Sequence, residues 1–130
     1  WRRLFDDGAA AALYGALAGF LLLLGLGSGH AVGALDGRDS IVAFIVGFLL
    51  PLVTGALTHL LPVWLLRGKR TPRRDRLHVA LRRGGAQRAL LFLAAGALLG
   101  SGVGAGLWPA LLGLLHFLGV LLQALWAHRE

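Results

Sequence analysis

Residues 40–66 read SIVAFIVGFLLPLVTGALTHLLPVWLL, a stretch without a single Asp, Glu, Lys or Arg. A helix needs about 20 apolar residues to cross a hydrocarbon core about 30 Å thick, so this stretch is long enough to span a bilayer. Three further apolar stretches lie at residues 8–29, 89–106 and 109–127. Because only helices and closed barrels satisfy their backbone groups in lipid, the pattern predicts an all-α integral membrane four-helix bundle with short outer loops. The Gly-rich end of the third stretch could leave that span short.

The composition excludes a water-soluble domain. Hydrophobic residues make up 57% of the 130 residues, and the mean hydropathy is +0.73. A chain of this length is one domain at most, so we expect residues 1–130 to form a single transmembrane domain. The absence of Cys leaves no thiolate ligand or thiol nucleophile. The absence of Met indicates an N-terminus that is processed or incompletely represented.

The charges lie in blocks and predict the orientation. The formal net charge is +7, and the segment 67–88 holds nine basic residues against the single Asp75. Cytoplasmic loops carry the excess of Lys and Arg. With both termini and this loop in the cytoplasm (N-in, C-in), twelve of the thirteen basic residues lie on that side. We therefore expect an inner-membrane protein of a bacterium.

The basic loop also has a candidate ligand. Anionic lipid headgroups attract juxtamembrane basic residues by about 1 kcal/mol each, although plain orientation by positive charge explains the same pattern. A short surface helix over residues 75–83 is expected within it. Nucleic-acid binding is disfavoured, since the basic residues lie between apolar spans and no interleaved aromatics accompany them. The candidate headgroup contacts are Arg67, Lys69, Arg70, Arg73 and Arg74.

Small residues at four-residue spacing predict close helix contacts. Such pairs let backbones approach where lipid supplies no hydrophobic drive. The pairs are Gly15 with Gly19, Gly25 with Gly29, and Gly96 with Gly100.

The second span carries the candidate chemistry. Gly47, Pro51, Gly55 and His59 recur every four residues and share one helix face. A flat face that ends in an imidazole suits a planar macrocycle such as haem b, with His59 as the axial ligand. It equally suits a neighbouring helix, with His59 as a hydrogen-bonding group. His116 in the fourth span is a second candidate haem-iron ligand, but we expect it about 12 Å from His59 in depth, which disfavours a shared iron.

Several other chemistries are absent from the sequence. It has no nucleophile–base pair, no phosphate-binding loop and no dinucleotide fingerprint. None of the four spans contains a carboxylate, and a coupled transporter usually needs one. A stand-alone transporter is therefore disfavoured.

Residues 47–62, GFLLPLVTGALTHLLP, support a resemblance. This stretch resembles one helix of the haem–copper oxidase and nitric-oxide-reductase catalytic subunits, which often carry the form G-x7-G-x3-H-L-L-P. The family's helix usually has a further haem-ligating His near its start, whereas residues 39–44 here contain none. The family's catalytic subunits also have about twelve spans and a histidine cluster around copper. The resemblance therefore implies a shortened, ligand-depleted relative.

Three functions follow as hypotheses. The first is a small accessory subunit, without catalysis of its own, that packs its Gly-rich faces against larger subunits of a respiratory-type redox complex. The second is a stand-alone haem-b protein that transfers electrons through His59 or His116. The third is a transporter subunit.

Overall fold

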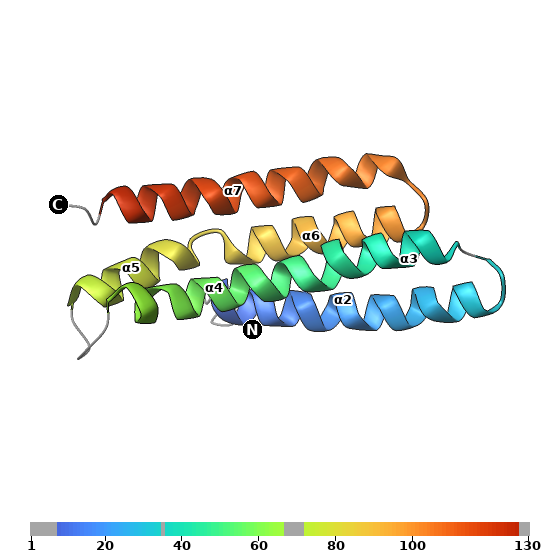
Figure 1. The fold of residues 1–130 in the computed structure, drawn as a ribbon, viewed down its shortest axis with the longest axis horizontal. Helices are drawn as coiled ribbons and strands as arrows, with labels where there is room; N and C mark the ends of the chain where they lie inside the picture. Colours follow the sequence, from blue (N-terminus) through green and yellow to red (C-terminus); the bar gives the residue numbers. More distant parts are fainter. Residues whose placement is uncertain (1–7, 35, 67–71, 128–130) are drawn as a thin grey trace.

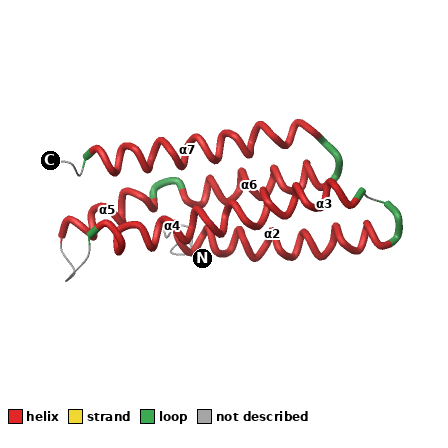
Figure 2. The backbone as a smooth tube through the Cα atoms, viewed as in Figure 1, coloured by secondary structure: helices red, strands yellow, loops and turns green. Residues whose placement is uncertain are grey.

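The structure, a computed structural model, describes residues 8–34, 36–66 and 72–127, and helices with short turns account for all of this backbone (Figure 1, Figure 2). The all-α prediction is confirmed. In chain order the elements are α2 (Gly8–Ala31), α3 (Gly37–Ala43), the π-helical turn η1 (Phe44–Leu49), α4 (Leu50–Leu65), α5 (Pro72–Arg82), α6 (Gly85–Gly100), the 3-10 turn η2 (Gly104–Gly106) and α7 (Leu107–Trp126).

The long elements lie side by side and alternate in direction along the chain (Figure 1). α3, η1 and α4 follow one another without a break and form one rod. Three helical segments are long and apolar enough to cross a membrane, namely Ala10–Ala31, Arg38–Leu65 and Gly104–Trp126. These segments coincide with the first, second and fourth expected spans, and they make the chain a membrane protein.

The π-helical turn η1 lies just ahead of Pro51. Pro51 has no N–H, so the carbonyl of Gly47, four residues earlier, has no α-helical donor. The ladder widens before the proline, where the N–H of Leu50 donates to the carbonyl of Ile45, five residues earlier. The carbonyl oxygen of Gly47 lies so close to Gly19 of α2 that a Cβ added to Gly19 would overlap it. The proline thus frees a carbonyl that a neighbouring helix covers.

α6 occupies the centre of the molecule. It contacts α2, α3, η1, α4 and α7, and in Figure 1 it lies between α7 and the other long helices. Small side chains let these neighbours approach closely. The buried residues of α6 are Gly85, Arg88, Ala89, Phe92, Ala95, Gly96, Leu99 and Gly100.

The third span differs from its expected range 89–106. α6 begins at Gly85 and ends at Gly100, so its 16 residues cover about 24 Å, less than the hydrocarbon thickness. Its end is set by the Gly-rich run that follows, where Gly102 takes a φ of 78° that few side chains tolerate. The helix thus begins four residues before the expected span and ends six residues before its expected end, as the Gly-rich end allowed.

The expected basic loop 67–88 is also largely helical. α5 covers Pro72–Arg82, longer than the short helix expected over 75–83, and only two residues separate it from α6. Leu77 and Leu81 of α5 are buried and form a cluster with Ala124 of α7, against which Leu61 and Leu66 pack. α5 therefore lies level with the last turns of α4 and α7.

Candidate functional site

The predicted haem face of the second span is occupied by other helices. Gly47 lies against α6, where a Cβ added to Gly96 would stand 2.7 Å from the Cα of Gly47. Gly55 lies against α2, where its added Cβ would stand 2.7 Å from the Cβ of Ala12. Contacts this close leave no room for a macrocycle against either glycine. Haem therefore does not fit on the Gly47–Gly55 face.

His59 lies beyond that face, near the end of α4. Its side chain is exposed on the described surface, and its ring meets the ring of His78 edge-on, with centroids 5.3 Å apart and planes at 87°. His78 lies on α5 and is half-buried. Periodicity did not predict this pairing, because 18 residues lie between the two histidines in the chain.

His116 lies at the junction of α5 and α6. A Cβ added to Gly84 would overlap its imidazole ring, and Gly84 has a φ of 68°. His116 is the tenth of the 20 residues of α7 and therefore lies near the middle of that helix, level with the turn between α5 and α6. The structure places His59 against His78 and His116 against Gly84. Ligation of haem by either histidine stays a prediction.

Within the described ranges, no three His, Asp or Glu side chains cluster closely enough to hold a metal ion. Polar side chains in the second span bond within their own helix instead. The hydroxyl of Thr54 donates to the carbonyl of Leu50 at 2.8 Å, and that of Thr58 donates to the carbonyl of Thr54 at 2.8 Å. These hydroxyls satisfy themselves against the preceding turn and offer no chemistry.

Four of the glycines predicted for helix packing, Gly15, Gly19, Gly96 and Gly100, lie at helix contacts, whereas an added Cβ at Gly25 has no described atom of another segment within 4 Å. An added Cβ would stand 2.8 Å from the Cβ of Ala89 at Gly15, and would overlap the Gly47 carbonyl at Gly19. At Gly100 it would overlap the side chain of Leu26. Together with Gly96, these residues bring α2, α6 and the second span close together.

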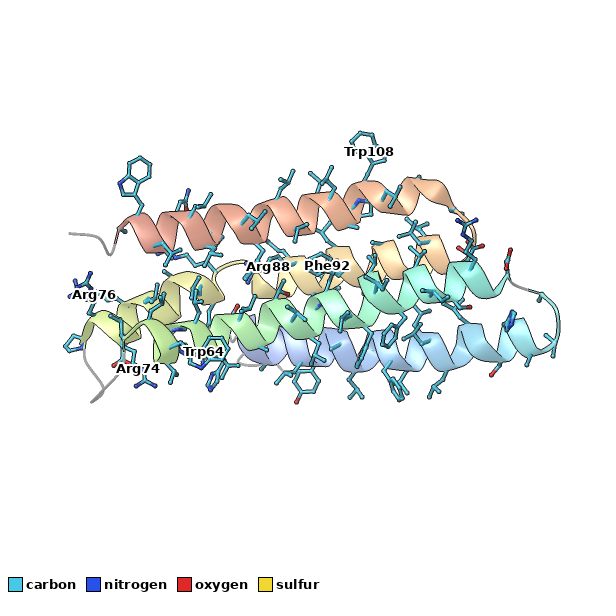
Figure 3. All side chains as sticks on the ribbon, in the orientation of Figure 1. Trp64, Arg74, Arg76, Arg88, Phe92 and Trp108 are labelled. Atoms are coloured by element: carbon cyan, nitrogen blue, oxygen red, sulfur yellow. The ribbon has the colours of Figure 1, made fainter. Side chains whose placement is uncertain are left out.

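Arg88 is the residue whose role the sequence did not indicate. It was counted with the basic loop, but it lies in the first turn of α6 and is 3% exposed. Its guanidinium donates to the carbonyl of Arg83 at 2.7 Å and to that of Leu81 at 3.2 Å. The same group lies 5.3 Å from the ring centroid of Phe117. Figure 3 shows Arg88 and Phe92 directed into the space between α6 and α7.

Arg88 therefore joins three helices. The guanidinium caps the C-terminal end of α5 by donating to carbonyls that would otherwise lack donors. Its contact with the ring of Phe117 extends to α7. The signal that could have located it is its distance from the other basic residues, because four uncharged residues separate it from Arg83.

The predicted headgroup contacts are only partly described. Arg67, Lys69 and Arg70 lie outside the described residues. Arg73 is exposed and Arg74 is half-buried, and both lie in the first turn of α5. Figure 3 shows Arg74 beside the labelled Arg76 at this end of the molecule. Two surface hollows lie nearby along α5, with volumes of about 470 and 350 Å³.

Tryptophans lie near both ends of α7. Trp108 and Trp126 are 69% and 78% exposed, and their separation of 18 positions in α7 corresponds to five turns and about 27 Å. They therefore share one face, and their separation is close to the hydrocarbon thickness. Trp64, 58% exposed, lies near the end of α4 beside α5 (Figure 3). Exposed indoles at two levels are typical of membrane–water interfaces.

These features define an all-helical membrane protein with a closely packed glycine and alanine interior. No protein-family model, curated protein or solved structure matches the chain.

Proposed function

We propose that this chain is a non-catalytic accessory subunit that assembles with larger membrane proteins of a respiratory-type redox complex. The observation that supports it is a division among the glycines. Gly15 and Gly19 of α2 are covered by neighbouring helices, whereas at Gly25 and Gly27 of the same helix, and at Gly119 of α7, no other segment of the described residues lies within 4 Å of an added Cβ.

A glycine that faces lipid lowers the stability of its helix and makes no helix–helix contact in return. Gly in a helix is about 1 kcal/mol less favourable than Ala, and its advantage in membranes is that it lets another backbone approach. Gly25 and Gly119 interrupt apolar surfaces formed by large exposed side chains such as Leu24, Leu118 and Leu122. These notches suit helices of a partner protein.

The redox assignment is supported by the resemblance of residues 47–62 to a helix of haem–copper oxidases. The orientation we propose is N-in, C-in in a bacterial inner membrane. Its supports are the twelve basic residues that fall on one side and the exposed indoles near both ends of α7. In this orientation α5, Trp64 and Trp126 lie at the cytoplasmic interface.

Native gel electrophoresis of the tagged full chain, extracted from its membrane in mild detergent, tests the assembly. We expect the chain to migrate with larger subunits, and the substitutions Gly25→Leu and Gly119→Leu to release it. Leu21→Ile is the matched control, because Leu21 lies one turn before Gly25 and is also exposed. Migration of the wild-type chain alone would contradict an accessory role.

An absorbance spectrum separates this proposal from the alternative of a haem-binding protein. That alternative remains because the side chain of His59 is exposed and accessible to a ligand. A Soret band that belongs to the complex and not to the isolated chain supports the accessory role. A Soret band of the isolated chain that disappears in His59→Ala supports electron transfer by this chain itself. Substrate flux in liposomes that contain only this chain would instead support transport.

A further inference from the structure

We propose that a second copy of this chain binds along one edge of α7, so that the chain forms a parallel dimer in the membrane. This α7 edge consists of Leu112, His116, Gly119 and Gln123, which follow one another at intervals of four, three and four residues and are all exposed. The inference goes beyond the proposed function, because the dimer needs no larger subunit. In the proposed complex the chain would join the larger subunits as a pair, so that Gly119→Leu would release it there as well.

Two polar side chains on the α7 edge carry the inference. His116 is the tenth of the 20 residues of α7, and Gln123 lies two turns further along this apolar helix. Both are exposed, and neither side chain hydrogen-bonds to another residue that the structure describes. A polar group that faces hydrocarbon without a hydrogen-bond partner is costly, and such side chains in spanning helices usually bond across to another helix. Lipid alone therefore does not suit this edge.

The described part of the chain leaves the α7 edge uncovered. α7 packs on α6 and α5, and its side toward them points about a third of a turn away from the edge. Between the two polar residues, an added Cβ at Gly119 has no described atom of another segment within 4 Å. A glycine at this place lets a second backbone approach closely enough for the neighbouring polar side chains to bond across. The buried residues on the packed side of α7 are Ala110, Gly113, Phe117 and Ala124.

Symmetry favours a second copy as the occupant. A two-fold dimer uses the same patch on both copies, so the patch must be complementary to itself. The amide of a glutamine is both donor and acceptor, and so is an uncharged imidazole. The α7 edge has no Asp, Glu, Lys or Arg, so no like charges meet across the axis. Because both copies insert in the same orientation, a two-fold axis along the membrane normal brings Gln123 of each copy to the same depth.

Disulfide cross-linking in the membrane locates the interface, and the chain has no Cys of its own to interfere. Leu112→Cys, on the edge and 56% exposed before substitution, should give a covalent dimer under mild oxidation. Leu118→Cys is the matched control, because Leu118 is 42% exposed but points about a third of a turn away from the edge. Equal cross-linking of the two variants would overturn the edge as the interface.

Sedimentation equilibrium of the purified full chain in detergent micelles measures the affinity of the dimer. We expect Gln123→Leu to weaken dimerisation about tenfold, because both copies lose the bonding amide, and Gly119→Leu to abolish it. Gln87→Leu is the matched control, since Gln87 is also exposed but lies in the first turn of α6. Equal weakening by Gln123→Leu and Gln87→Leu would overturn hydrogen bonding across the edge.

Failure of the dimer and failure of the accessory role give different results. A wild-type chain that is monomeric when purified, yet migrates with larger subunits from its membrane, would overturn the dimer and leave the accessory role intact. A wild-type chain that is dimeric when purified but migrates without larger subunits would support the dimer and contradict the accessory role.

Discussion

Gly19→Ala is the substitution for which the structure makes the strongest prediction. A Cβ at this position of α2 would overlap the carbonyl oxygen of Gly47, and it would stand 2.7 Å from the Gly47 carbonyl carbon and 3.2 Å from the amide nitrogen of Phe48. All three atoms belong to the backbone of η1. No side chain can rotate away, so the two helices must separate.

The size of the effect follows from that separation. Carbon contacts are optimal at about 3.5–4.0 Å, so α2 must retreat by about 1 Å, and overpacking of this kind costs about 1–3 kcal/mol. We expect the upper part of this range because both partners are backbone. Ala is a better helix former than Gly by about 1 kcal/mol, which leaves a net loss of about 2 kcal/mol.

Gly25→Ala is the matched control on the same helix. An added Cβ there has no neighbour within 4 Å among the residues that the structure describes, so only the gain in helix propensity remains, at most about 1 kcal/mol. The two variants should therefore differ by about 3 kcal/mol in the free energy of unfolding. Titration of the purified chains with a denaturing detergent, followed by tryptophan fluorescence, measures the difference. Equal stability of the two variants would refute the contact between α2 and η1.

Three further predictions follow from the same contacts. Arg88→Met should destabilise the chain by about 3 kcal/mol or more, because it leaves two carbonyls at the end of α5 without their donor. An unfolding midpoint equal to that of the wild type would contradict a stabilising role for these two hydrogen bonds. Phe92→Ala removes a ring that is 0% exposed and should cost about 3–5 kcal/mol, whereas Leu90→Ala on the exposed side of the same helix should cost far less in the same titration. A cysteine placed at Arg73 should react with an impermeant maleimide only from the cytoplasmic side, and one at Val103 only from outside; the reverse pattern would overturn the proposed orientation.

The apolar stretches were readable from the sequence because lipid imposes a simple requirement of length and lack of charge. The first, second and fourth helices accordingly lie over the expected residues. The third differs because Arg88 was counted with the loop on the basis of its charge. The carbonyls of Leu81 and Arg83 and the ring of Phe117 hold Arg88 inside the molecule. Its separation from the other basic residues hints at a different place, but the partners themselves are tertiary contacts that the local sequence does not specify.

The candidate site was likewise predictable only as far as local sequence patterns reach. The spacing of Gly47, Pro51 and Gly55 at intervals of four residues predicted a flat helix face, but a flat face suits a macrocycle and a helix equally. The choice depends on whether α2 and α6 approach it, which is a tertiary matter. The contact of His59 with His78 likewise arises because α5 runs back along α4. The periodicity of residues within either helix cannot predict such a contact.

The short, arginine-bearing α6 has a consequence for how this chain enters the membrane during synthesis. α6 has only 16 residues and carries Arg88 near one end. Insertion of this helix into the bilayer by itself, through the translocon, is therefore unfavourable. The Gly-rich turn at 101–103 and the short 3-10 turn η2 connect α6 to the more apolar α7. The two would then partition into lipid together as a hairpin, and the chain downstream of α6 would decide whether the third helix becomes embedded at all.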